Sequence, residues 1–253
     1  MHDLGHTRSA NRRDHLLQTP DTFVRTPLPG LTGGAAIVHT APEMGAAFAM
    51  MTVEFESGGS LTHACGQRPC QRFVYVLEGE LRLEQPGLRQ DVLQQGGFAY
   101  LPAQQPHRLE AKGKVRAIVL DKTHSLLDPT ATRPAEPQFV RGAEEIILPA
   151  PLNGDSGVQV RGLLPPEMCF DFAVNTMTYA PGASLAQVEV HYMEHGLLML
   201  EGAGIYRLGD AWYPVQAGDF IWMAPFCPQW FGCIGKTPAK YLIYKNFNRH
   251  VLA

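Results

Sequence analysis

Short apolar runs separated by turn-forming residues make up most of the chain. They are rich in Val, Ile, Leu, Tyr and Phe, and most end at Gly, Pro or Asn. Clear examples are residues 48–55, 73–79, 97–102, 115–121, 196–202, 219–225 and 239–247. Runs of about four to eight residues bounded by turn residues are typical of β-strands, and long stretches of helical periodicity are nearly absent. The pattern predicts an all-β protein with helix confined to short pieces.

The same pattern occurs twice along the chain. The sequence Leu-Glu-Gly at residues 77–79 returns at residues 200–202, an offset of 123. The positions of Gly96 and His107 return, at an offset of 122, as Gly218 and Gln229. An internal repeat of this length predicts two tandem copies of one β-domain.

Residues 123–137 lie between the two copies and are rich in Pro and Thr without any periodicity. This segment is the expected linker. We therefore predict one domain over residues 1–130 and a second over residues 131–253. Residues 1–40 could pack against either domain.

Charge, cysteine content and apolar segments limit the partners, metal sites and location to be expected. The chain has 253 residues and a formal net charge of −3, with Lys and Arg scattered along it. This balance gives no electrostatic reason to expect nucleic acid or a membrane as partner. Five cysteines without a Cys-x-x-Cys pair predict neither a disulfide framework nor a thiolate zinc site. With no apolar leader and no run of about 18 apolar residues, we expect a cytoplasmic protein.

Glu189, His191 and His195 form the clearest candidate for chemistry. If residues 189 and 191 share a strand, their side chains share a face, and His195 can join them after a short turn. Two imidazoles and a carboxylate without sulfur suit Mn(II) or Fe(II) better than Cu(I) or structural zinc. Gln229 is either a fourth, amide ligand or only a hydrogen-bond partner.

Tyr241, Ile243 and Lys245 share one face of another predicted strand. A lysine on an inward face is costly unless an anion accompanies it, and a substrate carboxylate beside the metal would supply that anion. The alternative is that Lys245 sits at the end of the strand and reaches solvent.

The two copies resemble the cupin family. Its first motif carries two His and a Glu and reaches a Gly after six residues, and its second runs from Gly through Pro to a His. The second copy has these ligands in the permuted order Glu189, His191, His195, with Gln229 in place of the last His. Together with YAPGAS, EGAGIYRLGDAWYPVQAGDFIWMAP and YLIYKNFNR, this order is similar to the (S)-ureidoglycine aminohydrolase family.

The resemblance implies a bicupin, an all-β chain of two tandem jelly-roll barrels. It implies hydrolytic deamination of (S)-ureidoglycine to (S)-ureidoglycolate and ammonia, a step of allantoin catabolism in purine degradation. It makes Glu189, His191, His195 and Gln229 the ligands of Mn²⁺. Glu189, Tyr241 and Lys245 become the catalytic and substrate-binding residues, with Tyr206 also lining the pocket. Exposed sheet edges of such barrels favour a homo-oligomer.

The first copy lacks the ligand set. The aligned positions fall at Gly66, Arg68 and Arg72, none of which can bind a cation. His107 keeps its place without fellow ligands, as a packed or surface histidine, and His63 is near the aligned positions in sequence only. We expect a structural barrel without metal.

Two other functions remain compatible with the sequence. Two His and one carboxylate with open positions also describe non-haem iron oxygenases and related decarboxylases. A non-catalytic bicupin that binds a small molecule is the third possibility. There is no phosphate loop and no nucleophile elbow in the chain.

Overall fold

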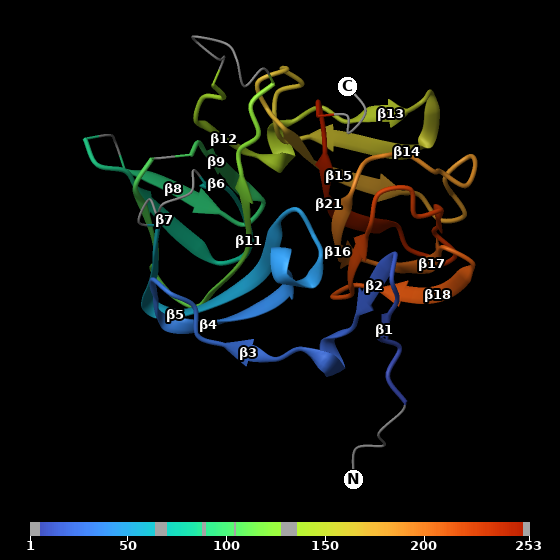
Figure 1. Ribbon diagram of the computed structural model, residues 1–253, viewed down its shortest axis with the longest axis horizontal. Helices are drawn as coiled ribbons and strands as arrows, with labels where there is room; N and C mark the ends of the chain where they lie inside the picture. The colour runs from blue at the N-terminus through green and yellow to red at the C-terminus, as the bar shows by residue number, and fades with distance from the viewer. Residues whose placement is uncertain (1–5, 64–69, 88–89, 104, 128–135, 250–253) are drawn as a thin grey trace. The chain divides into compact units, whose positions relative to one another are not determined.

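The structure, a computed structural model, describes residues 6–63, 70–87, 90–103, 105–127 and 136–249. In this part of the chain, the helical elements are three short 3-10 turns at Pro20–Thr22, Pro42–Met44 and Glu144–Ile146. All other regular elements described are strands, so the predicted all-β class is confirmed (Figure 1). No helix among the described residues has the length and apolar character needed to cross a membrane.

The chain divides into two compact units. The N-terminal unit holds Val24–Ile147 and Glu167–Asp171, and the C-terminal unit holds Met1–Phe23, Leu148–Pro166 and Phe172–Ala253. This division differs from the predicted boundary between residues 130 and 131. The start of the chain joins the C-terminal unit because strand β2 (His15–Gln18) pairs with β19 (Phe220–Met223). Residues after 130 stay in the N-terminal unit because β12 (Val140–Ala143) pairs with β9 (Gly97–Leu101).

One sheet builds the N-terminal unit, in the order β12-β9-β6-β11-β5-β10-β7-β8, with β4 pairing both β5 and β3. Apolar side chains that alternate along these strands form a core, which includes Val74, Val76 and Val119. The strands are β3 (Arg25–Thr26), β4 (Leu31–Thr40), β5 (Ala49–His63), β6 (Cys70–Glu78), β7 (Glu80–Glu84), β8 (Asp91–Gln94), β9 (Gly97–Leu101), β10 (His107–Ala111), β11 (Val115–Thr123) and β12 (Val140–Ala143).

Two sheets build the C-terminal unit: one in the order β1-β2-β19-β16-β21-β15-β14-β13, the other β18-β17-β20. Both contribute to one apolar core, which includes Tyr206 of β17 and Tyr241 of β21. The strands are β1 (Ala10–Asn11), β2 (His15–Gln18), β13 (Ala150–Leu152), β14 (Asp155–Gly162), β15 (Phe172–Tyr179), β16 (His195–Glu201), β17 (Ala203–Leu208), β18 (Ala211–Gln216), β19 (Phe220–Met223), β20 (Gln229–Gly232) and β21 (Ala239–Asn246).

The repeated Leu-Glu-Gly sequence marks the same tight turn in both units. Gly79 and Gly202 have positive φ values of 86° and 70°. A Cβ at these positions would lie 2.5 Å from the Lys114 carbonyl oxygen and 2.3 Å from that of Pro238. Only glycine tolerates both the conformation and the close backbone approach, which explains why the repeat is visible in the sequence.

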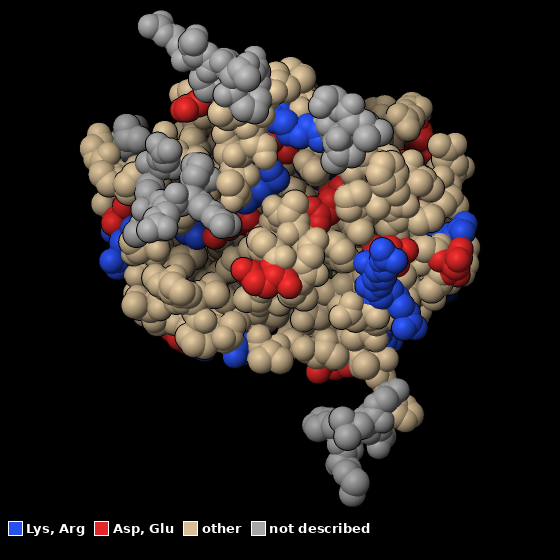
Figure 2. Space-filling model, in the orientation of Figure 1, with Lys and Arg blue, Asp and Glu red and all other residues tan. Residues whose placement is uncertain are grey.

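Charged side chains of both signs are interspersed on the face that Figure 2 shows. Several pair on the surface of the N-terminal unit, such as Arg25 with Glu54 and Arg116 with Glu78. Exposed pairs of this kind contribute little to stability, and the fold rests mainly on its buried apolar side chains.

Candidate metal centre and substrate pocket

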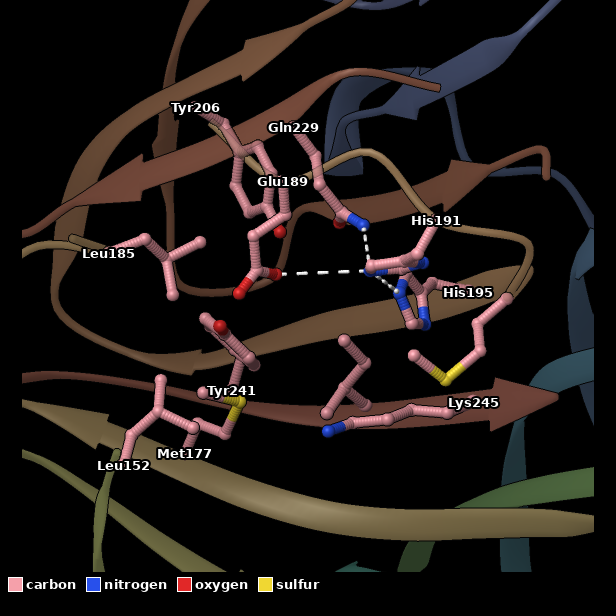
Figure 3. Close-up of a pocket in the computed structure, with 12 residues that line it drawn as sticks. Leu152, Met177, Leu185, Glu189, His191, His195, Tyr206, Gln229, Tyr241 and Lys245 are labelled. Atoms are coloured by element: carbon pink, nitrogen blue, oxygen red, sulfur yellow. Dashed lines mark hydrogen bonds and ion pairs between the residues drawn. The ribbon is translucent and has the colours of Figure 1, made fainter. Parts of the chain in front are cut away.

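A cavity of about 130 Å³ lies inside the C-terminal unit. All the side chains predicted for the site line it, and the rest of its wall is mostly apolar (Figure 3). The predicted set is Glu189, His191, His195, Tyr206, Gln229, Tyr241 and Lys245, and the other lining residues are Leu152, Met177, Leu185, Met193 and Ile243. The fold thus brings together every residue that the sequence singled out in this half of the chain.

Glu189 and His191 lie on an extended segment outside the sheets, so the strand predicted for them is wrong. One antiparallel bridge holds this segment: Glu189 N donates to Gln229 O at 2.8 Å, and Gln229 N donates to Glu189 O at 2.9 Å. Directly opposed residues in such a bridge point to the same side. The bridge therefore aims the Glu189 carboxylate and the Gln229 amide into one cavity without a full strand.

The two imidazoles are neighbours at one end of the cavity, with their rings edge to face and the centroids 4.9 Å apart (Figure 3). His195 Nδ1 donates to the Tyr244 carbonyl oxygen at 3.2 Å, which leaves its Nε2 directed at His191 Nε2, 3.4 Å away. Gln229 Nε2 donates to His191 Nε2 at 2.9 Å, and Glu189 Oε2 lies 3.8 Å from the same nitrogen. Four side chains from three segments thus converge on one point (Figure 3).

The convergence fits a divalent cation. Burial, with Lys245 and His191 nearby, lowers the pKa of His195 to about 3, so this imidazole is neutral at ordinary pH, as a metal ligand must be. The backbone acceptor on its Nδ1 fixes the ring as outer-sphere partners of metal ligands do. A half-turn of the Gln229 carboxamide would present its oxygen, giving two nitrogens and two oxygens without sulfur.

Solvent reaches the site from the side of Glu189. The side chains of Glu189 and His191 keep 35% and 22% of their exposure, while His195 is buried. The carboxylate is therefore the predicted ligand best placed to exchange protons with water.

Lys245 lines the cavity, so the alternative in which it extends into solvent does not hold. It lies opposite His195 in the register of β16 and β21. Burial lowers the pKa of its ammonium, and Glu189 partly offsets this effect. With the Asn175 amide oxygen turned towards it, Lys245 Nζ donates to that oxygen at 3.2 Å. Sequence reasoning missed Asn175, although a polar residue in the apolar run FAVNTMTY was an available signal.

Two tyrosines line the cavity at the end away from the two histidines (Figure 3). Tyr241 and Tyr206 are almost fully buried, and burial raises the pKa of both hydroxyls well above the ordinary value. The Tyr241 hydroxyl shares a 2.7 Å hydrogen bond with that of Tyr179, a residue that no sequence motif indicated. Both phenols stay protonated and can offer a hydrogen bond to a ligand.

The matching place in the N-terminal unit holds an arginine. Arg72 is buried and pairs with Asp121 through two contacts of 2.7 and 2.8 Å, and it donates to His107 Nε2 at 3.3 Å. Asp121 is the register partner of Arg72, as Lys245 is of His195. A guanidinium and a carboxylate therefore stand where the other unit has an imidazole and an ammonium.

His107 is buried, which agrees with a packed histidine, and its Nε2 accepts the hydrogen bond from Arg72. The pairing of β5 with β10 also places His63 opposite His107, with the rings stacked at 4.9 Å, so the two are neighbours in space. Gly66 and Arg68 lie outside the described residues.

Comparisons with known proteins place the chain in a family. Residues 51–121 and 175–244 match the model of the cupin domain. An (S)-ureidoglycine aminohydrolase of Arabidopsis thaliana is 38% identical over 255 residues, which cover 100% of this chain and 82% of that protein. The chain belongs to the (S)-ureidoglycine aminohydrolase family of cupins.

Bacterial relatives agree with this assignment. The (S)-ureidoglycine aminohydrolase of Escherichia coli is 30% identical over 243 residues, covering 93% of this chain and 89% of that protein. The crystal structure of protein Ylba from E. coli superposes with a TM-score of 0.83 at 26% identity, covering 97% of this chain and 96% of the other. The predicted bicupin fold and the predicted enzyme family are both confirmed.

Proposed function

We propose that the chain catalyses the hydrolytic deamination of (S)-ureidoglycine to (S)-ureidoglycolate and ammonia, within allantoin catabolism. We also propose Mn²⁺ as its metal, held by Glu189, His191, His195 and Gln229. The observation that carries the proposal is the meeting of this ligand set with Lys245 in one small cavity.

Lys245 and Tyr241 form the side of the cavity that would receive the substrate carboxylate. A half-buried ammonium gains most from an anion, and the Tyr241 hydroxyl can add a hydrogen bond. Fixing the carboxylate at one end and the polar groups at the metal end leaves one orientation for the central carbon. Holding both ends restricts the poses open to the substrate, which supports selection of one enantiomer.

The reaction breaks the bond from the central carbon to the amino nitrogen and forms a bond from that carbon to a water oxygen. Nitrogen leaves as ammonia after gaining a proton, and the water loses one. A bound divalent ion would supply Lewis-acid anchoring of the substrate's polar groups. Glu189 is the carboxylate suited to carry the proton from water to the leaving amine, because it is partly exposed beside His191.

Ammonia release from (S)-ureidoglycine, with Mn²⁺ supplied to chelator-treated protein, tests this function. The wild type should exceed the spontaneous rate, and Glu189→Gln should fall towards it. Glu201→Gln removes an exposed carboxylate at the end of β16 and should leave the rate unchanged. A wild-type rate equal to the spontaneous one contradicts the proposal, and oxygen consumption in its place would favour the oxygenase alternative.

A further inference from the structure

A second group of metal-binding side chains lies in the C-terminal unit, outside the cavity. Asp14, His15 and Cys227 each offer one ligand atom, and these three atoms all lie within 4.8 Å of one another. His15 and Cys227 are buried, whereas the Asp14 side chain keeps 45% of its exposure. The cluster is therefore fixed on its inner side and open to solvent through the carboxylate.

Backbone pairing holds the three residues together. β2 begins at His15, which lies opposite Met223 of β19. Ala224 N donates to Asp14 O at 2.9 Å, and Cys227 N donates to Ala224 O at 3.1 Å in the turn that follows β19. Neither the carboxylate nor the thiol depends on a flexible tail for its position.

The imidazole of His15 is oriented for a ligand at Nδ1. Its Nε2 forms a 2.9 Å hydrogen bond with the Tyr213 hydroxyl, and its Nδ1 lies 2.9 Å from Asp14 Oδ1. Without a cation, Nδ1 donates to the Asp14 carboxylate; a cation that replaced this proton would be bound by the Nδ1 lone pair, with Nε2 donating to Tyr213. A hydroxyl or carboxylate on the remote nitrogen is the usual way in which a metal-binding histidine is held.

A glycine leaves space beside these atoms. Gly209 has a φ of +58°, and a Cβ there would lie 3.0 Å from Asp14 Oδ2 and 3.8 Å from His15 Nδ1. The Cys227 thiol contacts the Pro228 carbonyl oxygen at 3.6 Å, a weak hydrogen bond that a cation could replace. The turn at residue 209 thus keeps side-chain atoms away from the open side of the cluster.

We propose that Asp14, His15 and Cys227 form a second cation site that prefers Zn²⁺. One thiolate, one imidazole and one carboxylate with a water from the exposed side make a tetrahedral set of the kind zinc takes. The sulfur separates this site from the Mn²⁺ set, which contains none. None of Asp14, His15 and Cys227 lines the cavity that holds the proposed Mn²⁺ ligands, so the two sites share no side chain.

A zinc ion here would link the start of β2 to the turn that leads into β20, the strand that begins at Gln229. The predicted absence of a thiolate zinc site rested on the lack of a Cys-x-x-Cys pair. That criterion cannot detect ligands that come from opposite ends of the chain.

Cobalt is the probe for this site, since Co²⁺ bound to a thiolate absorbs in the near ultraviolet and Co²⁺ bound only to nitrogen and oxygen lacks that band. Chelator-treated full-length protein titrated with Co²⁺ should gain the band, and excess Zn²⁺ should remove it. Cys227→Ser and His15→Gln should lose the band, while Cys233→Ser, which removes another buried thiol of the same unit, should keep it. No band in the wild type, or a band that survives Cys227→Ser, overturns the proposal.

A second measurement does not depend on any variant folding. X-ray absorption at the zinc edge, on wild-type protein whose first site is filled with Mn²⁺, should show one sulfur among the zinc neighbours. A zinc shell of nitrogen and oxygen alone overturns the site. Neither measurement involves ammonia release, so failure here leaves the proposed reaction untouched.

Discussion

Lys245 lies directly opposite His195 across the antiparallel strands β16 and β21, and both side chains line the same cavity. Burial and its neighbours keep His195 neutral, so the ammonium is the nearest resident cation to the proposed metal ligands. A divalent ion at these ligands and the Lys245 ammonium would be two neighbouring positive charges, which need negative charge close by. Glu189 supplies part of it, and a substrate carboxylate is the group that would complete the balance.

Replacing Lys245 with Met should lower kcat/KM by about 100-fold or more, chiefly through KM. Truncating one member of a buried charged pair costs about 2–5 kcal/mol. Lys240→Met, on the same strand but paired with Glu201 away from the cavity, should change kcat/KM little. Steady-state kinetics on the two variants give both values of kcat/KM. An equal fall in the two variants would show that the effect of Lys245→Met is structural.

Asn175→Leu should raise KM by about 5- to 10-fold while leaving metal content unchanged. The variant removes the amide oxygen that accepts from Lys245 and so loosens the ammonium, at a cost of about 1 kcal/mol. A fall in kcat at constant KM would argue against a positioning role for Asn175.

Mn²⁺ retention should fall in the order wild type, Gln229→Ala, His191→Ala. An amide is the weakest donor of the set, so its loss should weaken binding by about 10-fold, whereas loss of an imidazole should abolish stoichiometric binding. Free Mn²⁺ measured by electron paramagnetic resonance gives both affinities. His107→Ala in the N-terminal unit is the matched control, and a loss of Mn²⁺ there would contradict the assignment of the site to the C-terminal unit.

Arg72→Met should destabilise the N-terminal unit by about 3 kcal/mol, since it leaves Asp121 without its charged partner. The double variant with Asp121→Leu should recover much of that loss. Hydrogen exchange of amides in β6 and β11 reports the stability of this unit alone. A double variant no better than Arg72→Met would mean that the pair is not an isolated electrostatic unit.

The N-terminal unit should lose stability as the pH falls below 6.5. Burial lowers the pKa of His39 from 6.5 to about 3, so between these values the unfolded chain binds the extra proton and the folded chain does not. The contribution is complete above pH 6.5 and declines by about 1.4 kcal/mol per pH unit below it. Hydrogen exchange in β4 and β5 at two pH values should show a shallower decline in His39→Gln.

His107, with its pKa lowered to about 4, adds to this dependence and should preserve part of it in the variant. An unchanged slope in His39→Gln would exclude His39 as a source.

The sequence alone predicted those parts of the fold and site that depend on local spacing. Strand alternation placed Tyr241 and Lys245 on one face, and the turn glycines marked the repeat. It could not predict that β2 pairs with β19, because strands some two hundred residues apart carry no local sign of their partner. For the same reason the sequence did not indicate Asn175, because its hydrogen bond with Lys245 depends on the pairing of its strand with β21.

In the N-terminal unit, the Arg72–Asp121 pair occupies the place where the C-terminal unit has its proposed metal ligands. A guanidinium is a positive charge attached by covalent bonds, so neither a chelator nor a shortage of metal in the cell can remove it. Among the described residues, the N-terminal unit fills this position with its own side chains. The proposed ion would belong to the C-terminal unit, so metal starvation should empty that site and leave the Arg72–Asp121 pair in place.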